Sequence, residues 1–263
     1  MTAPPSRILA EDRGFVRILT IDNPQKRNAL DYGSLEDLTR ACADAARDRV
    51  RCLVIRGTGD SFCSGFDIGS MESDGRGGDR PDLAVERAME AVETVPCPTV
   101  AFVNGAAFGA GCELAVTCDL RVARAGAQLG MPPAKLGVVY AAAGLRRFLA
   151  LVGPGHTREM FFTGKPMDAE TARGVGLVDR VLAAEHAEQD ALGLAEEIAR
   201  NAPLAVQGMK RILRLLAAAH ERGLTEAERI EVSDLRSRAF ESADLREGRA
   251  AWAERRPPRF RGE

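Results

Sequence analysis

Two glycine-containing turns carry main-chain groups that could stabilise a negative charge. One is Phe62-Cys-Ser-Gly-Phe-Asp67, and the other runs from Gly105 to Gly111. Each follows an expected strand, and ligands of parallel sheets bind at the carboxyl edge where such turns lie. A turn that leads into a helix also leaves N–H groups without intrahelical partners. One N–H from each turn would form a two-pronged oxyanion hole, whereas either turn taken alone is more simply explained by backbone geometry.

Glu113 lies two residues after Gly111, in the first turn of the helix expected there. A carboxylate at this position complements the positive end of the helix dipole. The same carboxylate could act as a general acid or base on a ligand that meets the turn. Sequence periodicity alone does not separate these two interpretations.

Other catalytic constellations are not supported by the sequence. The spacing Gly105-x-x-x-Gly109-x-Gly111 is not the dinucleotide-binding pattern, and no Gly-Lys-Ser/Thr of a P-loop follows either turn. The three histidines lie outside both turns, and no G-x-S-x-G elbow is present. The six cysteines are scattered without a C-x-x-C pair, so we expect no metal site and assign the cysteines to the core.

Composition indicates an ordinary globular protein. Hydrophobic residues make up 45% and charged residues 28% of the 263 residues, enough for one α/β domain or a large domain with a small appendage. The net charge of -2 gives no electrostatic footprint for nucleic acid. The N-terminal sequence has no apolar run typical of a signal peptide, and no stretch reaches transmembrane length. We therefore expect a cytoplasmic protein with reduced cysteines that does not associate with membranes.

The elements that must position these residues follow from hydrophobic periodicity. The first half reads as a layered α/β region, with a helix capped by Ser34, a second helix over Pro81–Thr94 and a mobile polar loop over 70–80. Strands are expected at 15–21, 50–55, 99–103 and 120–123. After about residue 143 the pattern becomes helical, with helices over 184–200, 204–220, 225–241 and 244–254 and one short strand near 177–181.

From about Phe15 to Gly262 the chain closely resembles the crotonase superfamily, the enoyl-CoA hydratase/isomerase group. The order and spacing of several motifs make this resemblance specific. They are Lys26-Arg-Asn-Ala-Leu-Asp31, Ser61-Phe-Cys-Ser-Gly-Phe-Asp-Ile68, Val103-Asn-Gly-Ala-Ala-Phe-Gly-Ala-Gly-Cys-Glu-Leu114, Pro133-Ala-Lys-Leu-Gly137, Thr163-Gly-Lys-Pro166 and Ser242-Ala-Asp-Leu-Arg-Glu-Gly248.

The resemblance implies an α/β fold, a crotonase-like spiral of ββα units with a C-terminal helical trimerisation region. We place the spiral core with the acyl and coenzyme A site at 1–200, and the helical region for oligomerisation and pocket closure at 201–263. The resemblance also implies a homotrimer or a hexamer built as a dimer of trimers. Coenzyme A would enter as part of an acyl thioester substrate, with no permanently bound cofactor.

The resemblance also implies roles for particular residues. The oxyanion donors would be the N–H groups of Phe66 and Ala110. The coenzyme A moiety would be held by residues of two segments, and the charges of the first suit phosphate groups. These residues are Lys26, Arg27, Ala29, Leu30, Ser64, Asp67 and Ile68.

The sequence departs from the family pattern at one catalytic position. Family hydratases commonly use two glutamates; Glu113 matches the first, and the second falls on Pro133, which cannot transfer a proton. Tyr140 follows in Gly137-Val-Val-Tyr140, where some family members similar to decarboxylases place a tyrosine near the acyl group. A tyrosine in a loop is also commonly a packing residue.

We therefore expect an acyl-CoA-processing enzyme of the hydratase/isomerase type, a lyase or isomerase with Glu113 as acid/base and Tyr140 as a candidate catalytic residue. Two alternatives remain open. One is an acyl-CoA decarboxylase or hydrolase on the same fold, because Pro133 replaces the usual second glutamate. The other is a non-catalytic acyl-CoA-binding scaffold, because fold does not fix function.

Overall fold

The computed structural model describes residues 6–67, 69, 81–218, 225–254 and 256–263. The expected loop over 70–80 and Ile68 lie outside the described residues. Within the described part, none of the helices combines the length and apolar character that a membrane span requires.

A six-stranded sheet forms the centre of the molecule, in the order β1-β2-β3-β5-β7-β10. Strand β1 pairs with β2 in antiparallel fashion, and the other neighbours are parallel. The strands are β1 (Arg7–Arg13), β2 (Val16–Asp22), β3 (Cys52–Gly57), β5 (Thr99–Val103), β7 (Leu120–Arg124) and β10 (Arg180–Leu182). The sequence predicted the central strands but not β1, whose side chains are mostly exposed and therefore give little hydrophobic pattern.

A second sheet of four short strands lies in the order β4-β6-β8-β9. Its members are β4 (Ser61–Cys63), β6 (Ala106–Phe108), β8 (Gln128–Gly130) and β9 (Met167–Asp168). The chain alternates between the sheets, so that a strand of the first sheet, a strand of the second and a helix recur three times, as β3-β4-α2, β5-β6-α3 and β7-β8-α4. This repeat is the expected spiral of ββα units.

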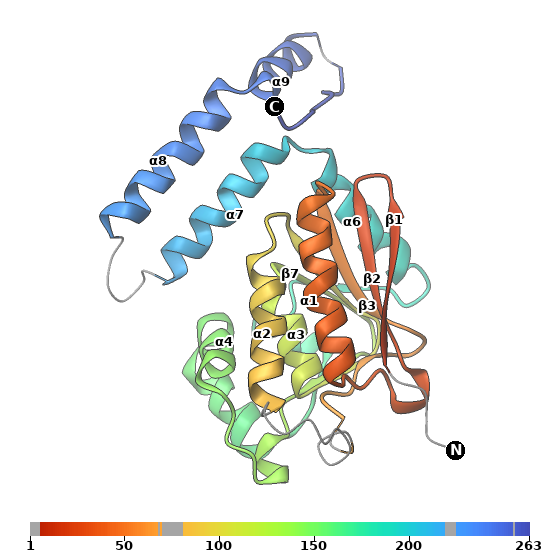
Figure 1. Ribbon diagram of the computed structural model, residues 1–263. Coiled ribbons are helices and arrows are strands. Elements are labelled where there is room, and N and C mark those ends of the chain that lie inside the picture. Colours follow the sequence, from red (N-terminus) through yellow and green to blue (C-terminus); the bar gives the residue numbers. More distant parts are fainter. Residues whose placement is uncertain (1–5, 68, 70–80, 219–224, 255) are drawn as a thin grey trace.

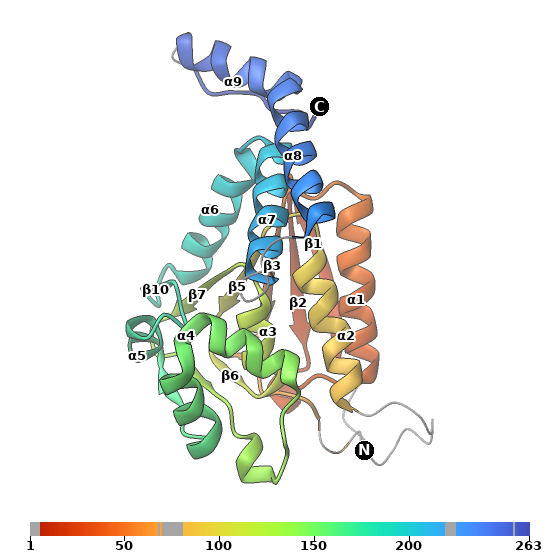
Figure 2. The ribbon, with the colours of Figure 1, turned by 90° about the vertical axis from the view of Figure 1, so that its left-hand side faces the viewer.

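Helices cover both faces of the six-stranded sheet (Figures 1 and 2). The helices are α1 (Tyr32–Arg47), α2 (Pro81–Thr94), α3 (Ala110–Thr117), α4 (Ala142–Thr163), α5 (Ala169–Gly174), α6 (Ala187–Arg200), α7 (Pro203–Ala218), α8 (Glu226–Glu241) and α9 (Ala243–Ala253). Along β2, Val16 and Ile18 pack in the core beneath α6, whereas Leu19 and Ile21 belong to the larger core beneath the other helices. Burial on both faces explains why the parallel strands read as nearly continuous apolar runs.

Two details of the core bear on the sequence predictions. All six cysteines are buried and unpaired, as expected. Helix α1 is capped by Asp31 and not by Ser34: the Asp31 carboxylate accepts from Ser34 N, and Ser34 Oγ accepts from Asp31 N. Ser34 is thus the third helical residue of a capping box, and the expected cap was three residues late because either side chain can take that role.

The C-terminal helices extend away from the two sheets (Figures 1 and 2). Helix α7 is attached by Lys210, a buried residue whose Nζ donates to Cys97 O at 2.9 Å and lies 2.7 Å from Asp119 Oδ2. Beyond α9 the chain returns, and buried Asp244 accepts from the backbone N–H groups of Arg261 and Gly262. These helices begin and end within a few residues of the predicted bounds.

Candidate active site

The two glycine turns lie side by side because β4 and β6 are parallel neighbours, with Ser61 opposite Ala106. Residues 64–67 of the first turn follow β4 and residues 109–111 of the second follow β6, so both lie at the carboxyl ends of strands, as expected, but these strands belong to the small sheet and not to the central one. The contact between them is close: a Cβ on Gly65 would lie 3.0 Å from Phe108 O and 3.7 Å from Ala110 N. Gly65 also has a φ of 107°, which disfavours any residue with a side chain.

Phe66 follows Gly65 and Ala110 lies beside it, and each has a main-chain N–H that its own element does not use. The parallel bridge between Leu30 and Phe66 uses the amides of Leu30, which donates to Gly65 O, and of Asp67, which donates to Leu30 O. In such a bridge the N–H of the central residue, Phe66, points to the opposite side. Ala110 is the first residue of α3, so its N–H has no acceptor within the helix.

Glu113 is the centre of a buried polar cluster in the same helix. Its side chain is only 4% exposed, and its two carboxylate oxygens have different partners. Tyr140 Oη donates to Oε2 at 2.5 Å, and Arg147 Nη1 donates to Oε1 at 2.9 Å. Arg147 also contacts Glu93 of α2, with Nη2 at 2.8 Å and Nε at 3.2 Å from Oε2. Residues from α2, α3, α4 and the loop before α4 therefore meet in one cluster, in which Tyr140 and Arg147 contact the Glu113 carboxylate and Glu93 contacts Arg147.

Burial and these partners act on the titration of Glu113 in opposite directions. Removal from water raises its pKa, while the hydrogen bond from Tyr140 and the positive charge of Arg147 lower it in part. The pKa of Tyr140 is raised well above 10, mainly by burial and then by the negative charge of Glu113. Tyr140 is therefore protonated near neutral pH and donates this proton in its hydrogen bond to Glu113. We refer to these two side chains as the Tyr140–Glu113 unit.

Glycine at position 144 is required by this cluster. A Cβ there would lie 2.6 Å from Tyr140 Cε1 and 2.8 Å from Glu113 Oε1. Gly144 lies in the first turn of α4, so the helix backbone approaches the two side chains directly. The start of α4 is thus shaped to leave room for the Tyr140–Glu113 pair.

The residues expected to hold coenzyme A are brought together into one unit, apart from Ile68. Ser64 N donates to Arg27 O at 3.0 Å, and Ser64 Oγ donates to Lys26 O at 2.9 Å. Ala29 and Leu30 are buried beside this junction, and Arg27 is exposed. Lys26 Nζ lies 2.5 Å from Asp67 Oδ2, so the predicted phosphate-binding lysine is paired with another predicted residue.

Two buried asparagines, to which sequence reasoning gave no role, fix the loop between β3 and β4 that leads into the first turn. Asn28 Nδ2 donates to Thr58 O at 2.9 Å and to Ser61 O at 2.7 Å. Asn104 donates to Gly57 O at 3.0 Å and accepts from Gly57 N at 3.0 Å. Both asparagines lie within the quoted family motifs, which was the available signal.

Pro133 is buried and begins the short 3₁₀ helix η3 (Pro133–Leu136). Its ring has no group that could transfer a proton. At this position the folded chain therefore has no side chain that could take the role of a second catalytic glutamate.

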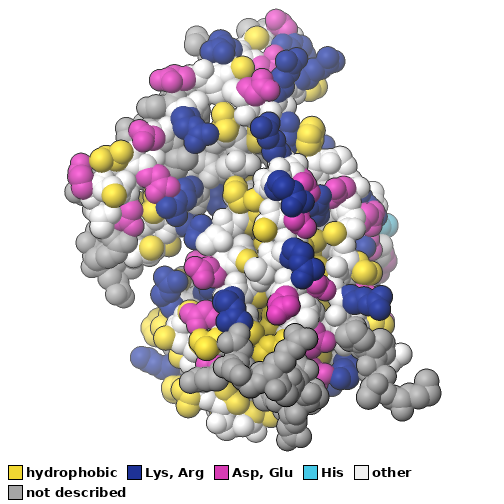
Figure 3. Space-filling view, viewed as in Figure 1, with side chains coloured by type: hydrophobic (Ala, Val, Ile, Leu, Met, Phe, Trp, Pro, Cys, Tyr) yellow, Lys and Arg dark blue, Asp and Glu magenta, His cyan; other side chains and the backbone are white. Residues whose placement is uncertain are grey.

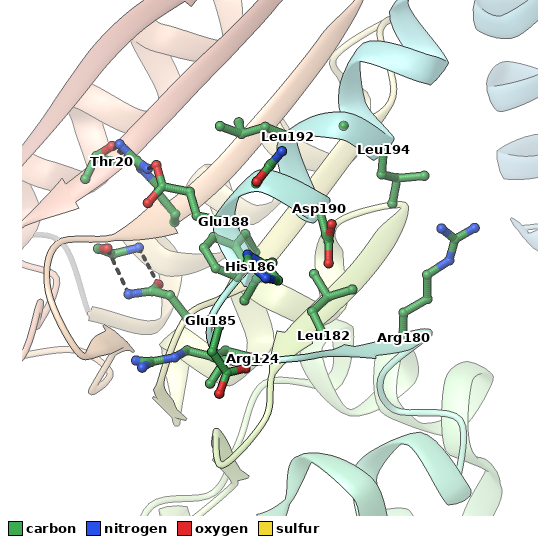
Figure 4. Close-up of a pocket in the computed structure, with 18 of the residues that line it drawn as sticks. Thr20, Arg124, Arg180, Leu182, Glu185, His186, Glu188, Asp190, Leu192 and Leu194 are labelled. Carbon is green, nitrogen blue, oxygen red and sulfur yellow. Dashed lines mark hydrogen bonds and ion pairs between the residues drawn. The ribbon is translucent and has the colours of Figure 1, made fainter.

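A large groove lies elsewhere, between α6 and the carboxyl ends of strands in the central sheet (Figure 4). Its volume is about 1340 Å³, and its lining includes Arg124, Arg180, Glu185 and His186. It contains neither the Glu113 cluster nor the two glycine turns. Charged side chains of both signs are interspersed over the face of the molecule shown in Figure 3, without a field of one sign.

Comparison with known proteins agrees with the motifs and the fold. The sequence profile of the enoyl-CoA hydratase/isomerase family matches residues 11–263. The chain belongs to this family. Its fold is accordingly that of the crotonase superfamily, and a crystal structure of an enoyl-CoA hydratase from Bacillus anthracis matches it with a TM-score of 0.86 and 28% identity, over 98% of this chain and 100% of the other.

Relatives within the enoyl-CoA hydratase/isomerase family carry different activities in their names. A probable enoyl-CoA hydratase of Mycobacterium bovis is 36% identical, over 93% of this chain and 96% of its own. A methylmalonyl-CoA decarboxylase of Escherichia coli is 31% identical, over 94% of this chain and 95% of its own. Membership therefore supports an enzyme that acts on acyl-CoA thioesters, while the reaction has to be argued from the site.

The predicted site residues fall into two groups in the structure. Tyr140 contacts Glu113, Gly65 next to Phe66 adjoins Ala110, and the segments around Lys26 and Ser64 adjoin the first turn. Arg147 and Glu93 were missed, because a charged residue in an amphipathic helix is usually assigned to the solvated face.

Proposed function

We propose that this protein binds an acyl-CoA thioester and stabilises its enolate with the N–H groups of Phe66 and Ala110, while Glu113 transfers a proton. The observation that supports this most strongly is the junction at Gly65, where the second turn comes within van der Waals reach of the first. Glu113 lies one helical turn after Ala110, so an acid/base group and an oxyanion donor share one short helix.

The proposed chemistry depends on where charge develops. When a bond at the α-carbon breaks, its electrons move onto the thioester oxygen, where two preorganised N–H donors would meet them. Removing one donor of this kind typically lowers the rate by about 10²–10³-fold. Glu113 would take or return the proton at the α- or a neighbouring carbon, with the Tyr140 hydroxyl on its other oxygen.

For the coenzyme A moiety we propose the unit formed by residues 26–30 and 64–67. Lys26 and Arg27 would meet phosphate groups, and the Lys26–Asp67 pair would open or be shared when a phosphate arrives. The Leu30–Phe66 bridge joins this unit to the proposed oxyanion donor, so the bound cofactor portion and the thioester oxygen would be placed by one piece of backbone.

Because Glu113 is the single carboxylate that we assign to proton transfer, the candidate reactions differ in how simply they can proceed. Hydration ordinarily divides the work of activating water and protonating carbon between two groups, whereas moving a double bond needs one base that shifts one proton. We propose an enoyl-CoA hydratase/isomerase type of reaction in which Glu113 does this work alone. Pro133 makes isomerisation the simpler of the two.

A second candidate, decarboxylation, is favoured by the 2.5 Å contact between Tyr140 and Glu113. The bond to the departing carboxylate would break, carbon dioxide would leave, and the electron pair would form the same enolate. The Tyr140–Glu113 unit would then deliver a proton to the α-carbon and regain one from water. The decarboxylase relative named above is consistent with this candidate.

A panel of thioesters tests these proposals. Hydration would remove the conjugated double bond of crotonyl-CoA, and isomerisation would form such a bond from a 3-enoyl-CoA. Decarboxylation would release carbon dioxide from methylmalonyl-CoA. Glu113→Gln should abolish turnover of the best substrate while leaving its Kd nearly unchanged. Equal turnover in variant and wild type would remove Glu113 from the mechanism, and tight binding of every thioester without turnover would favour a binding scaffold.

We also propose that the C-terminal region 201–263 assembles the chain into trimers or hexamers. Large apolar side chains remain exposed on its first helix, where Leu213 is 66% and Met209 is 56% exposed. Further exposed residues, such as Phe162, lie on α4. Light scattering after size exclusion would give the mass of the assembly. Leu213→Asp should lower this mass if α7 forms the interface. A monomeric mass for both the wild type and the variant would refute the proposal.

A further inference from the structure

Arg147 connects two carboxylates that come from different helices. Its side chain is 10% exposed, and it lies between Glu113 of α3 and Glu93 of α2. Nη1 donates to Glu113, while Nε and Nη2 both donate to one oxygen of Glu93. Each nitrogen of this guanidinium thus donates to a carboxylate, which is unusual for an arginine required only for solubility.

The geometry constrains Glu113 on both of its oxygens. The guanidinium is planar and is oriented by Glu93, so the direction of its Nη1–H bond is set before it reaches Glu113. Tyr140 occupies the other oxygen. With one donor on each oxygen the carboxylate cannot rotate freely, yet each oxygen retains a lone pair that could receive a proton.

We propose that Arg147, oriented by Glu93, is a positioning residue that holds the Glu113 carboxylate in one orientation for proton transfer. This inference rests on the acid/base role proposed for Glu113. Arg147 also supplies the positive charge that offsets the burial of Glu113, so its removal should raise the pKa of Glu113 further. Loss of the Glu93 charge should lower the pKa of Glu113, because the positive charge of Arg147 would then act on Glu113 alone.

Other titratable groups face Glu113 and must be counted. Glu86 of α2 adds a weak negative influence that raises the pKa of Glu113. Burial raises the pKa of the neighbouring Cys112 thiol to about 12, so it is neutral in the range of the assay. The groups are Glu86 on α2, Glu93 on α2 through Arg147, Cys112 on α3, Tyr140 in the loop before α4 and Arg147 on α4.

The test compares Arg147→Gln and Glu93→Gln over a range of pH on the substrate that turns over best. Arg147→Gln should lower kcat by about 10–100-fold, the loss expected when a reacting group is misplaced. The acidic limb of its kcat/KM profile should move to higher pH. Glu93→Gln should move that limb to lower pH. Arg147→Lys should recover only part of kcat, because an ammonium cannot reach both carboxylates in fixed directions.

Matched controls separate this role from a structural one. Arg146→Gln makes the same substitution at the preceding, exposed position of α4 and should match the wild type. Loss of stability alone would lower activity in both test variants without moving the limb in opposite directions. A wild-type profile in Arg147→Gln, with Glu113→Gln inactive, would overturn the positioning role and leave the proposed function intact. Full turnover in Glu113→Gln would overturn both.

Discussion

Replacing Gly144 by alanine is a small change that should disable the proposed acid/base unit. The added Cβ would lie 2.6 Å from Tyr140 Cε1, 2.8 Å from Glu113 Oε1 and 2.9 Å from Tyr140 Cδ1. Ordinary contact requires about 3.5 Å, so the ring must retreat by about 1 Å or the start of α4 must move by a similar distance. Either response pulls apart the 2.5 Å hydrogen bond between Tyr140 and Glu113.

The magnitude follows from the two effects of this overlap. Overpacking a filled site costs about 1–3 kcal/mol of unfolding free energy. A displacement of about 1 Å at a reacting group can lower the rate by about 100-fold. We therefore expect Gly144→Ala to fold at room temperature with a modest loss of stability and a much larger loss of kcat.

Urea denaturation and steady-state kinetics on the best thioester measure these two quantities in the same preparation. Gly155→Ala is the matched control, because it lies in the part of α4 beyond the break at Gly153 and its added Cβ would meet nothing within 4 Å. That variant should gain up to about 1 kcal/mol and keep its kcat. Wild-type kcat in Gly144→Ala would refute the reasoning, since the pair could not then depend on its present geometry.

Three further outcomes are expected elsewhere in the chain. Asn104→Ala should lower the free energy of unfolding in urea by roughly 3 kcal/mol, because buried backbone groups at Gly57 lose their partners; a loss below about 1 kcal/mol would contradict this assignment. Lys210→Met should cost about 1–2 kcal/mol, because Cys97 O loses its buried donor and the exposed Asp119 loses its ion pair, and unchanged thermal unfolding would argue against that attachment of α7. Glu113→Gln should lower the pKa of Tyr140, because the negative charge that raises it is removed while burial remains. Ultraviolet titration of tyrosinate in a Tyr32→Phe background follows this, because Tyr140 is then the one tyrosine of the chain, and an equal or higher pKa in the variant would show that the two groups are not coupled.

Much of the fold could be predicted from the sequence because local patterns and tertiary burial agree. Helix α2 spans Pro81–Thr94 and β5 spans Thr99–Val103, as predicted, because the apolar residues of α2 repeat at the helical period and those of β5 form a short continuous run. The strands of the small sheet were not predicted, because segments of two or three residues, such as β9, are too short to show any period. They nevertheless hold the two glycine turns together.

The residues of the site divide in the same way. Glycine at 65, glutamate at 113 and their motifs are properties of the sequence, and the family follows from them. The sequence alone also shows that Pro133 replaces an expected acid. What it could not show is that Arg147 lies against Glu113, 34 residues earlier in the chain, because an arginine on an amphipathic helix has the same local pattern whether water or a carboxylate surrounds it. Only the packing of α2, α3 and α4 against one another decides that, since burial makes a charge depend on partners that are distant in sequence.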